Sequence, residues 1–402
     1  MHPNHDGDAQ ALRPRIGGAA VAPAHDPAGL GGAVPGHGRR SLWQGVARLG
    51  GLFPEARAEN PPAGALLHGR GDSSGSWGAH GSLVRAAGRK GDREGPRFDE
   101  DVPAGGYSWW YVDAISDDGQ HGLTIIAFLG SVFSPYYKKS GRGDPLNHCS
   151  LNVALYGPQH RWVMTERGRG AVERDASNLV IGPSAVRWDG DALTIDIHEG
   201  DTRLFVPWQR KVTGRVRVYP EALNRAAFAL DPKESHIWHC LAPCARIEVE
   251  MQSPGLSWRG KAYLDHNRGA EPLETGFNTW HWSRAHLSDG ALVCYEGERG
   301  DGSLFASALR FGADGVPEPV DLPPIAGLPD SGWGITRRTR SDIGVAEVRR
   351  TWEDTPFYAR SELASRFLGE EVTAVQESLD MRRFSSRLVQ YMLPYRMPRR
   401  KR

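Results

Sequence analysis

The sequence has few cysteines, no long apolar run and no excess of either charge. Its 402 residues include only four cysteines, too few for a disulfide framework, and the N-terminus lacks a secretory pattern, so we expect a reducing, cytoplasmic compartment. The most apolar run, residues 122–133, is shorter than the roughly 20 residues that a membrane-spanning helix needs. Basic and acidic residues number 49 and 48, so the overall charge gives no reason to expect a nucleic acid as partner.

Motifs for bound cofactors are also missing. The chain contains no P-loop, no GxGxxG and no GxSxG pattern, so neither a nucleotide nor a serine nucleophile is indicated, and we expect no cofactor. HIWHCLAPC, residues 236–244, offers two histidines and two cysteines as zinc ligands. On a strand, however, His236 and His239 face opposite sides, and no second ligand pair completes a site. We therefore expect no metal.

The first part of the chain is compositionally distinct. Residues 1–94 are rich in Gly, Ala and Pro and contain few β-branched residues. Such a composition buries too little apolar surface to offset the entropy of ordering, so we expect a disordered leader. The RGD tripeptide at 70–72 is interpreted as chance within a Gly/Arg-rich tract.

From Phe98 onward the pattern is that of an all-β protein. SWWYVDAIS, DDG and HGLTIIAFLGSVF form a strand, a turn and a strand, and similar runs follow, with no convincing helix before the last 35 residues. The pattern restarts near residue 236, which predicts two meandering β units, each a barrel or a strongly bent sandwich. We place them at residues 95–230 and 231–380, followed by an amphipathic segment and basic tail at 381–402.

The tail RMPRRKR carries five positive charges in seven residues. Such a run is either a solvated end or a contact for an anionic membrane surface, where each nearby basic residue adds about 1 kcal/mol. In the second interpretation Phe384, Leu388, Tyr391 and Met392 lie in the membrane interface.

Tryptophan is abundant, with 13 residues in the chain. Most are expected to fill the core. In FNTWHWS, Trp280 and Trp282 share one face of a strand and His281 takes the other, and by the same alternation His236 and Trp238 share a face. An aromatic inward face can hold a long apolar ligand, so we predict that Trp280 and Trp282 bind substrate.

KAYLDHNRGAEPLE, residues 261–274, places Asp265 two residues from Tyr263, on the same strand face. On spacing alone, the favoured explanation of Asp265 is that it caps the turn made by HNRG. A carboxyl that faces an aromatic pocket is instead desolvated, so its pKa rises and it stays protonated near neutral pH. Such an acid can protonate an alkene carbon, aromatic faces stabilise the resulting cation, and water then adds.

Several separate stretches resemble the carotenoid 1,2-hydratases of photosynthetic bacteria, also called hydroxyneurosporene synthases. They are YSWWYVDAISDDGQHGLTIIAFLGSVFSPYY, HCSLNVALYG, SHIWHC, GKAYLDHNRGAEPLE and VQYMLPYRMPR. The resemblance covers about residues 98–398 and leaves out the glycine-rich leader. It implies two lipocalin-like β units and a cofactor-independent lyase that hydrates the terminal C1=C2 bond of acyclic carotenoids such as neurosporene and lycopene, giving a tertiary 1-hydroxy group.

The resemblance also implies site residues. Asp265 is the expected proton donor, and Tyr263, His236 and Trp238 are its expected supporting catalytic residues. The substrate is an insoluble polyene, so a protein without a spanning segment has to draw it from a bilayer. We therefore expect peripheral contact with membrane lipids on the cytoplasmic side of the inner, photosynthetic membrane.

Two other functions compete with this interpretation. In a non-catalytic lipocalin-like carrier of a hydrophobic pigment, Asp265 is only a turn cap, and fold alone does not separate a carrier from an enzyme. A glycosidase is the second competitor, because tryptophan-rich β folds with paired acids bind sugars. Against it, the sequence offers Asp265 no second inward carboxylate, since we expect Glu271 and Glu274 in the following loop.

Overall fold

The computed structural model describes residues 83–85, 95–200 and 211–400. All of them belong to one of the two units into which the chain divides, Leu49–Arg402. The predicted disordered leader, residues 1–94, and the RGD tripeptide within it fall outside the described residues, apart from the strand β1 (Leu83–Arg85).

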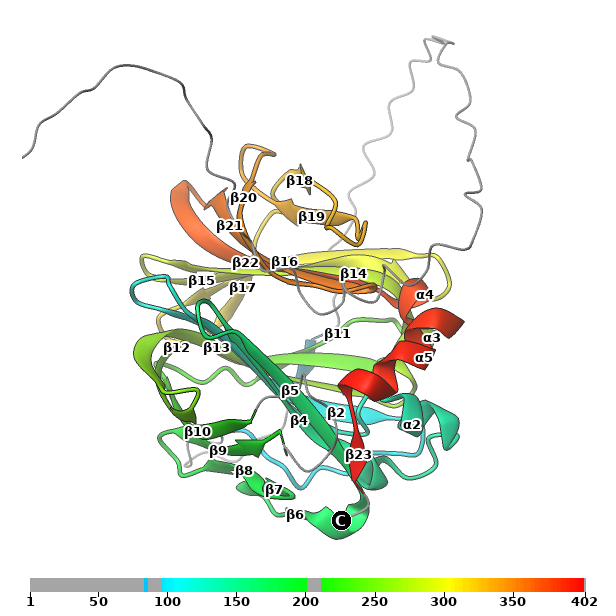
Figure 1. Ribbon diagram of the computed structural model, residues 1–402. Helices are drawn as coiled ribbons and strands as arrows, with labels where there is room; N and C mark the ends of the chain where they lie inside the picture. Colours follow the sequence, from blue (N-terminus) through cyan, green and yellow to red (C-terminus); the bar gives the residue numbers. More distant parts are fainter. Residues whose placement is uncertain (1–82, 86–94, 201–210, 401–402) are drawn as a thin grey trace, which may run out of the picture. The chain divides into compact units, whose positions relative to one another are not determined.

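The described residues lie mostly in antiparallel strands, so the all-β prediction is confirmed. The larger sheet has 14 strands among the described residues, β1 included, in the order β23-β5-β4-β3-β2-β13-β12-β10-β9-β8-β7-β6, with β11 paired to β12 and β1 paired to β11 off this path (Figure 1). Its strands are β2 (Tyr107–Ser116), β3 (Gly122–Leu129), β4 (Cys149–Tyr156), β5 (Arg161–Arg167), β6 (Val172–Arg174), β7 (Asn178–Ile181), β8 (Ser184–Trp188), β9 (Leu193–Glu199), β10 (Val212–Pro220), β11 (Ala226–Ala229), β12 (His236–Ser253), β13 (Leu256–Gly269) and β23 (Arg399–Arg400).

A second sheet has seven strands within the described part of the chain, in the order β17-β16-β15-β14-β22-β21-β20. They are β14 (Phe277–Leu287), β15 (Gly290–Arg299), β16 (Leu304–Gly312), β17 (Pro317–Pro319), β20 (Glu347–Asp354), β21 (Tyr358–Phe367) and β22 (Glu370–Asp380). A separate ribbon pairs β18 (Ile325–Leu328) with β19 (Arg337–Arg340). The sequence pattern predicts β14, β15, β16, β20 and β21, but not the short strands β17, β18 and β19 or the longer β22.

The strands on either side of the predicted domain boundary are hydrogen-bonded neighbours. β10 pairs with β12 from Thr213–Ser253 to Pro220–Ala245, and β2 is paired along its whole length with residues 260–269 of β13. The change from one sheet to the other comes between β13 and β14, at residues 270–276. A division into folding domains at residue 230 stays a prediction.

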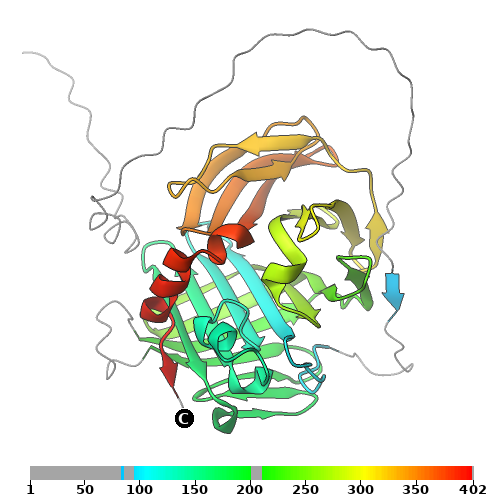
Figure 2. The same cartoon turned by 90° about the vertical axis from the view of Figure 1, so that its right-hand side faces the viewer.

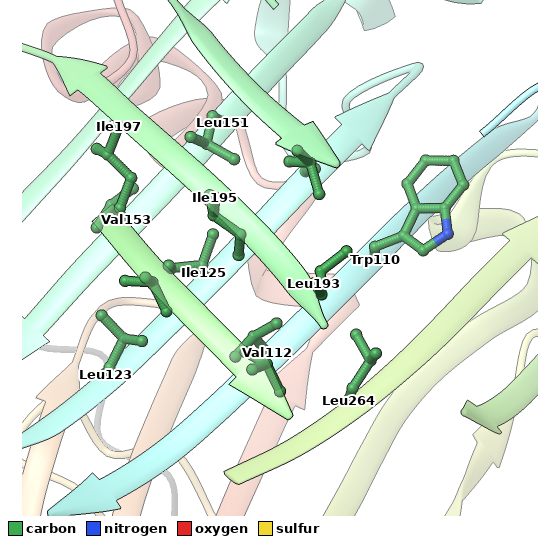
Figure 3. Close-up of a cluster of buried hydrophobic side chains, with 14 of the residues drawn as sticks. Trp110, Val112, Leu123, Ile125, Leu151, Val153, Leu193, Ile195, Ile197 and Leu264 are labelled. Atoms are coloured by element: carbon green, nitrogen blue, oxygen red, sulfur yellow. The ribbon is translucent and has the colours of Figure 1, made fainter. Parts of the chain in front are cut away.

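Two large clusters of buried side chains flank the larger sheet. The first is aliphatic and lies inside the curl of that sheet, where Val112, Ile125, Val153 and Ile195 point toward one another (Figure 3). The second is aromatic and joins the larger sheet to the smaller one, with Trp238 and Tyr263 packed among residues of β14 and β15. Each strand that borders both clusters therefore buries both faces, which is why β2 is buried at nine of its ten positions.

Short helices gather at the end of the smaller sheet where β14 begins and β22 ends (Figures 1 and 2). They are α3 (Leu273–Gly276), α4 (Met381–Phe384) and α5 (Arg387–Arg396), with α2 (Pro135–Lys139) in contact with α5. Side chains of Asp380 and Ser386 accept hydrogen bonds from backbone N–H groups in the first turns of α4 and α5, which caps both helices. Among the described residues no helix is long and apolar enough to cross a membrane.

The C-terminal tail is part of the fold as far as residue 400. β23 pairs in parallel with β5, Arg399 forms an ion pair with Glu166, and the Arg396 guanidinium lies 4.4 Å from the ring centre of Trp162. The interpretation of the tail as a merely solvated end is therefore wrong for residues 396–400, because these cations are held by the larger sheet.

Candidate active site

The predicted acid lies in the middle of a strand, on the face that meets the smaller sheet. In the antiparallel register, Asp265 on β13 is opposite Tyr111 on β2 and Cys240 on β12. Because strand side chains alternate, Tyr263 and Asp265 point to the same side, and both Tyr263 and Trp238 belong to the aromatic cluster. The prediction that Asp265 and Tyr263 share an inward face is confirmed.

The Asp265 carboxyl accepts hydrogen bonds from three neutral side chains. Tyr263 Oη donates to Oδ2 at 2.8 Å and Trp238 Nε1 donates to the same oxygen at 3.1 Å. Asn267 Nδ2 donates to Oδ1 at 3.0 Å. With two donors on Oδ2 and one on Oδ1, the geometry favours Oδ1 as the oxygen that carries the proton of the neutral acid.

Burial controls the protonation of this group. Asp265 is only 4% exposed, and loss of hydration raises its pKa to about 7, although its bonds to Tyr263 and Trp238 act in the lowering direction. Burial likewise raises the pKa of Tyr263 well above its ordinary value, so this phenol remains a donor. Asp265 is therefore a carboxylic acid that is substantially protonated at neutral pH. Tyr263 remains a hydrogen-bond donor to the carboxylate that is left after proton transfer.

The turn-cap interpretation of Asp265 is wrong. β13 continues in register to Gly269, four residues beyond Asp265, so HNRG is strand rather than turn. Within the described part of the chain, the hydrogen bonds to this carboxyl come from side chains and not from turn amides.

Aromatic rings surround the acid from both sheets. The Trp282 ring centre lies 5.2 Å from that of Tyr263 and 5.7 Å from that of Tyr111. Tyr295 on β15 lies 5.5 Å from Trp238. The rings thus form a wall of π faces around Asp265, a surface suited to apolar chains and to delocalised cations.

The two predicted substrate-binding tryptophans share this wall. Trp280 lies 5.9 Å from Tyr295, while His281 bonds Ser378 on the other face at 2.7 Å. The same-face prediction for Trp280 and Trp282 is confirmed, and their role in binding stays a prediction.

His236 shares the face of Trp238 but does not contact the acid. Its register partner is Gly269, so about four residues, or roughly 13 Å of strand, separate it from Asp265. The His236 ring is buried against Phe277 at 4.8 Å, Nδ1 lies 2.8 Å from Tyr107 Oη, and Nε2 lies 3.3 Å from Glu271. Its predicted catalytic role is therefore not supported by contact with Asp265 and stays a prediction.

Two glycines leave space for the His236 imidazole because they carry no Cβ. A Cβ on Gly276 would lie 2.0 Å from His236 Nε2, and one on Gly269 would lie 2.9 Å from Nδ1. Both positions need glycine as long as the ring keeps its place. Burial lowers the pKa of His236, so the ring is uncharged at neutral pH.

Sequence analysis missed a buried charged network beside the acid. Arg360 on β21 donates to Tyr111 Oη at 2.7 Å and forms ion pairs with Glu377 and Asp113. Tyr111 Oη in turn donates to Glu377 at 2.6 Å, and Arg284 Nε donates to Asp113 at 2.5 Å. Two arginines therefore match two carboxylates, and within the described ranges no cation contributes to lowering the pKa of Asp265.

The expectation that Asp265 has no second carboxylate nearby is wrong. Glu377 is close enough that its negative charge contributes to the raised pKa of Asp265. Its oxygen is nevertheless committed to Arg360 and Tyr111, unlike a glycosidase carboxylate that activates water or a sugar carbon. Glu271 follows β13 as expected, whereas Glu274 lies in α3 and pairs with Arg142.

This inter-sheet face changes character along its strands. At one end, called the aromatic end, lie Tyr107, Trp109, His236, Phe277 and Trp280. At the other, called the charged end, the same faces of β2, β14 and β21 present Asp113, Arg284 and Arg360, with Lys261 two residues beyond Tyr263 on β13. Asp265 lies between the two ends. The short helices lie at the aromatic end, because α3 and α4 contact β14 where that strand begins.

In the described residues, no group of three or more His, Cys, Asp or Glu side chains is arranged to hold a metal ion. His236 and His239 use opposite faces of β12, since His239 Nε2 bonds the Asn224 carbonyl at 2.8 Å.

Known proteins resemble this chain over most of its length. The family described as "Carotenoid hydratase CrtC" matches residues 125–402. An acyclic carotenoid 1,2-hydratase of Thiocapsa roseopersicina is 50% identical, with 93% of each chain covered. One of Rubrivivax gelatinosus is 49% identical, with 95% of each covered. The solved structure of a putative AttH from Nitrosomonas europaea is 16% identical, covering 71% of this chain and 99% of that one, with a TM-score of 0.47.

Proposed function

The chain belongs to the carotenoid hydratase family, and from this premise we propose that it adds water to the C1=C2 bond of acyclic carotenoids such as neurosporene and lycopene. The product carries a tertiary hydroxyl at C1. The observation that carries the proposal is a carboxyl enclosed by indole and phenol rings, Asp265, whose pKa burial raises to about 7.

Proton transfer is the first step. Asp265, neutral at rest, gives its proton to C2, and the electron pair of the double bond forms the new C2–H bond. The carboxylate left behind keeps its hydrogen bonds from Tyr263, Trp238 and Asn267, which stabilise the charge that develops in the transition state. General acid catalysis of this kind contributes roughly 100- to 10,000-fold to a rate.

The second step captures the cation. C1 carries the positive charge after protonation, and the faces of Trp238 and Trp282 offer it a negative quadrupole at close range. Water forms the C1–O bond and its surplus proton returns to the Asp265 carboxylate. The acid is regenerated, so the cycle needs no cofactor.

A direct test uses lycopene in detergent without added cofactor. The wild-type chain is expected to form a product heavier by one water, and Asp265→Asn is expected to bind lycopene but lose about 100- to 10,000-fold in hydration. Asn preserves size and removes the acid. Binding without turnover by the wild-type chain would instead establish the competing function, a pigment carrier.

We further propose that α5 contacts the membrane that supplies the substrate. Leu388, Tyr391 and Tyr395 are 68%, 69% and 54% exposed, and their spacing places them on one side of the helix, beside the exposed Arg387. Phe384, also expected in the interface, is instead fully buried against Phe133 and Phe357. The arrangement of one apolar stripe with nearby cations fits the surface of the anionic, cytoplasmic leaflet.

Vesicle flotation tests this second part separately. Replacing both Leu388 and Tyr391 by Asp is expected to abolish flotation with vesicles that contain anionic lipid, while hydration of lycopene in detergent is retained. Ile343→Asp, at a site that is 62% exposed elsewhere, is the control. Undiminished flotation of the double variant would remove α5 from membrane contact and leave the catalytic assignment intact.

A further inference from the structure

The charged end of the inter-sheet face opens into a pocket of about 720 Å³. The pocket lies between the β2–β3 turn, the end of β14 and the beginning of β22, and its walls include Lys261, Arg284, His286 and Glu371. Side chains of both charges line it, which makes it a site for water rather than for a polyene.

Arg284 joins this pocket to the surroundings of Asp265. It lines the pocket, it is only 3% exposed, and its guanidinium lies 5.9 Å from the ring centre of Tyr263, the phenol that donates to the acid. Its Nη2 and the Nε of Arg360 are buried without a hydrogen-bond partner among the described residues. Buried donors are nearly always bonded, often to water, so Arg284 Nη2, on a residue that lines the pocket, is suited to hold a water molecule on the side of the pocket nearest the acid.

The two reactants differ in polarity, and so do the two ends of the site. A polyene that reaches Asp265 fills the aromatic end, where the short helices lie, and so blocks that direction for water. Each turnover nevertheless consumes one water at C1. We propose that the charged-end pocket is the vestibule through which the reacting water reaches the site, with Arg284 as a positioning residue along the way; this inference rests on the proposed hydratase function.

The path is short. Lys261 is four residues from Asp265 on the same face of β13, and Thr373 is four residues from Glu377 on the same face of β22, so each pocket residue lies about 13 Å along its strand from the site. Both residues line the pocket and both are exposed. An indole at either position narrows the path without touching Asp265.

The test separates protonation from water addition by running the reaction in D₂O. Asp265 then transfers a deuteron to C2. If water arrives, it forms the C1–O bond and returns a deuteron to the carboxylate. If water does not arrive, the cation gives hydrogen from C2 back to the same carboxylate, and the alkene is recovered with a deuterium label.

Thr373→Trp is expected to lower hydration about tenfold or more and to raise the ratio of labelled lycopene to hydrated product by a similar factor. Mass spectrometry of both carotenoids gives this ratio. Ile343→Trp, on the surface outside the pocket, is expected to keep the wild-type ratio. Lys261→Trp is the second variant, should Thr373→Trp fail to fold.

An unchanged ratio of labelled lycopene to hydrated product in Thr373→Trp would contradict the proposal that water enters through this pocket. Equal loss of hydration and exchange would overturn it as well, because the damage would then lie at proton transfer. Failure of the wild-type chain to hydrate lycopene at all would mark failure of the proposed function itself.

Discussion

A buried carboxyl lies beside each of the two clusters, Glu199 beside the aliphatic one and Asp265 in the aromatic one, and the partners of the two carboxyls differ. Beside the first, Glu199 is held by a two-pronged contact with Arg167 at 2.9 and 3.0 Å. In the second, Asp265 receives only neutral donors, while the two nearby arginines are matched to Asp113 and Glu377. Burial raises the pKa of both carboxyls, but at Glu199 the Arg167 cation acts against the rise, whereas at Asp265 the groups that act against it are the neutral Tyr263, Trp238 and Asn267. A buried acid whose pKa is raised in a pocket of aromatic rings is a candidate for proton transfer.

The side chains that surround Glu199 and Asp265 also differ. The first cluster is built from Val, Ile and Leu of the larger sheet, with Trp110 at its border (Figure 3). Such side chains pack well but offer no charge or π face to a ligand. The second draws aromatic rings from both sheets. Stability and catalysis thus depend on different faces of the same strands, and each prediction below tests that separation.

After the loss expected for Asp265→Asn, the largest expected effect is on the turnover of Tyr263→Phe. Tyr263→Phe removes the strongest donor to Asp265, so the carboxylate formed on proton transfer is less stable, the acid is weaker, and hydration should fall about tenfold to one hundredfold. Because the Tyr263 bond lowers the pKa of Asp265, its loss also moves the fall in activity to higher pH. Tyr137→Phe, which removes a buried phenol bonded to the Gly106 carbonyl, should leave this pH dependence unchanged.

A second variant affects only stability. Ile195→Ala, in the aliphatic cluster, should lower the free energy of unfolding by about 2–5 kcal/mol, because it leaves a cavity in a close-packed region. Chemical denaturation measures this loss. Turnover per folded molecule should stay unchanged; a large fall in turnover would show that the two clusters are coupled.

The third variant, Glu377→Gln, should shift the pH dependence of activity in the direction opposite to that expected for Tyr263→Phe. Asp265 must be protonated to act, so activity falls as pH rises through its pKa. Arg360, Arg284, Asp113 and Glu377 are the charged groups that face it, and the charge of Glu377 acts in the raising direction.

Glu377→Gln removes that charge and leaves Arg360 with one anionic partner fewer, so the pKa of Asp265 falls and activity is lost at lower pH than in the wild type. A rate profile from pH 5 to 9 measures the shift. Glu199→Gln, which breaks a comparable buried pair outside the site, should destabilise the fold and keep the wild-type profile. A shift upward in Glu377→Gln would contradict the electrostatic account.

The smallest effect is expected at the aromatic end. Gly276→Ala places a methyl where His236 lies, so the imidazole must move while Asp265 keeps its bonds. Substrate affinity should weaken more than turnover, as a rise in KM with little change in kcat. Equal loss of both would indicate that His236 takes part in the chemistry after all.

Strand alternation predicted much of this site from the sequence. It placed Asp265 with Tyr263, Trp238 with His236, and Trp280 with Trp282. The same rule, applied to YSWWYVDAIS and FNTWHWSRAHL, puts Asp113 with Tyr111 and Arg284 with Trp282, so a signal for these two residues was present. The turn-cap interpretation failed because HNRG, with its Asn and Gly, is typical of turns, whereas pairing with two neighbours keeps it extended.

Other features had no such signal. Neither face of β22 is consistently apolar: Glu371, Thr373, Val375 and Glu377 alternate with residues such as Gln376, so hydrophobic patterning did not detect the strand or its inward carboxylate. The pairing of Glu377 with Tyr111 joins residues 266 positions apart. Contacts of this kind arise from how two sheets pack, and one sequence alone does not specify them.

The central claim is that burial without a cation keeps Asp265 protonated near neutral pH. Its carboxyl can be titrated by carbon-13 NMR of protein labelled at aspartate, with the Asp265→Asn spectrum identifying the resonance. The account predicts a pKa of about 7. An ordinary value, near about 4, would contradict it.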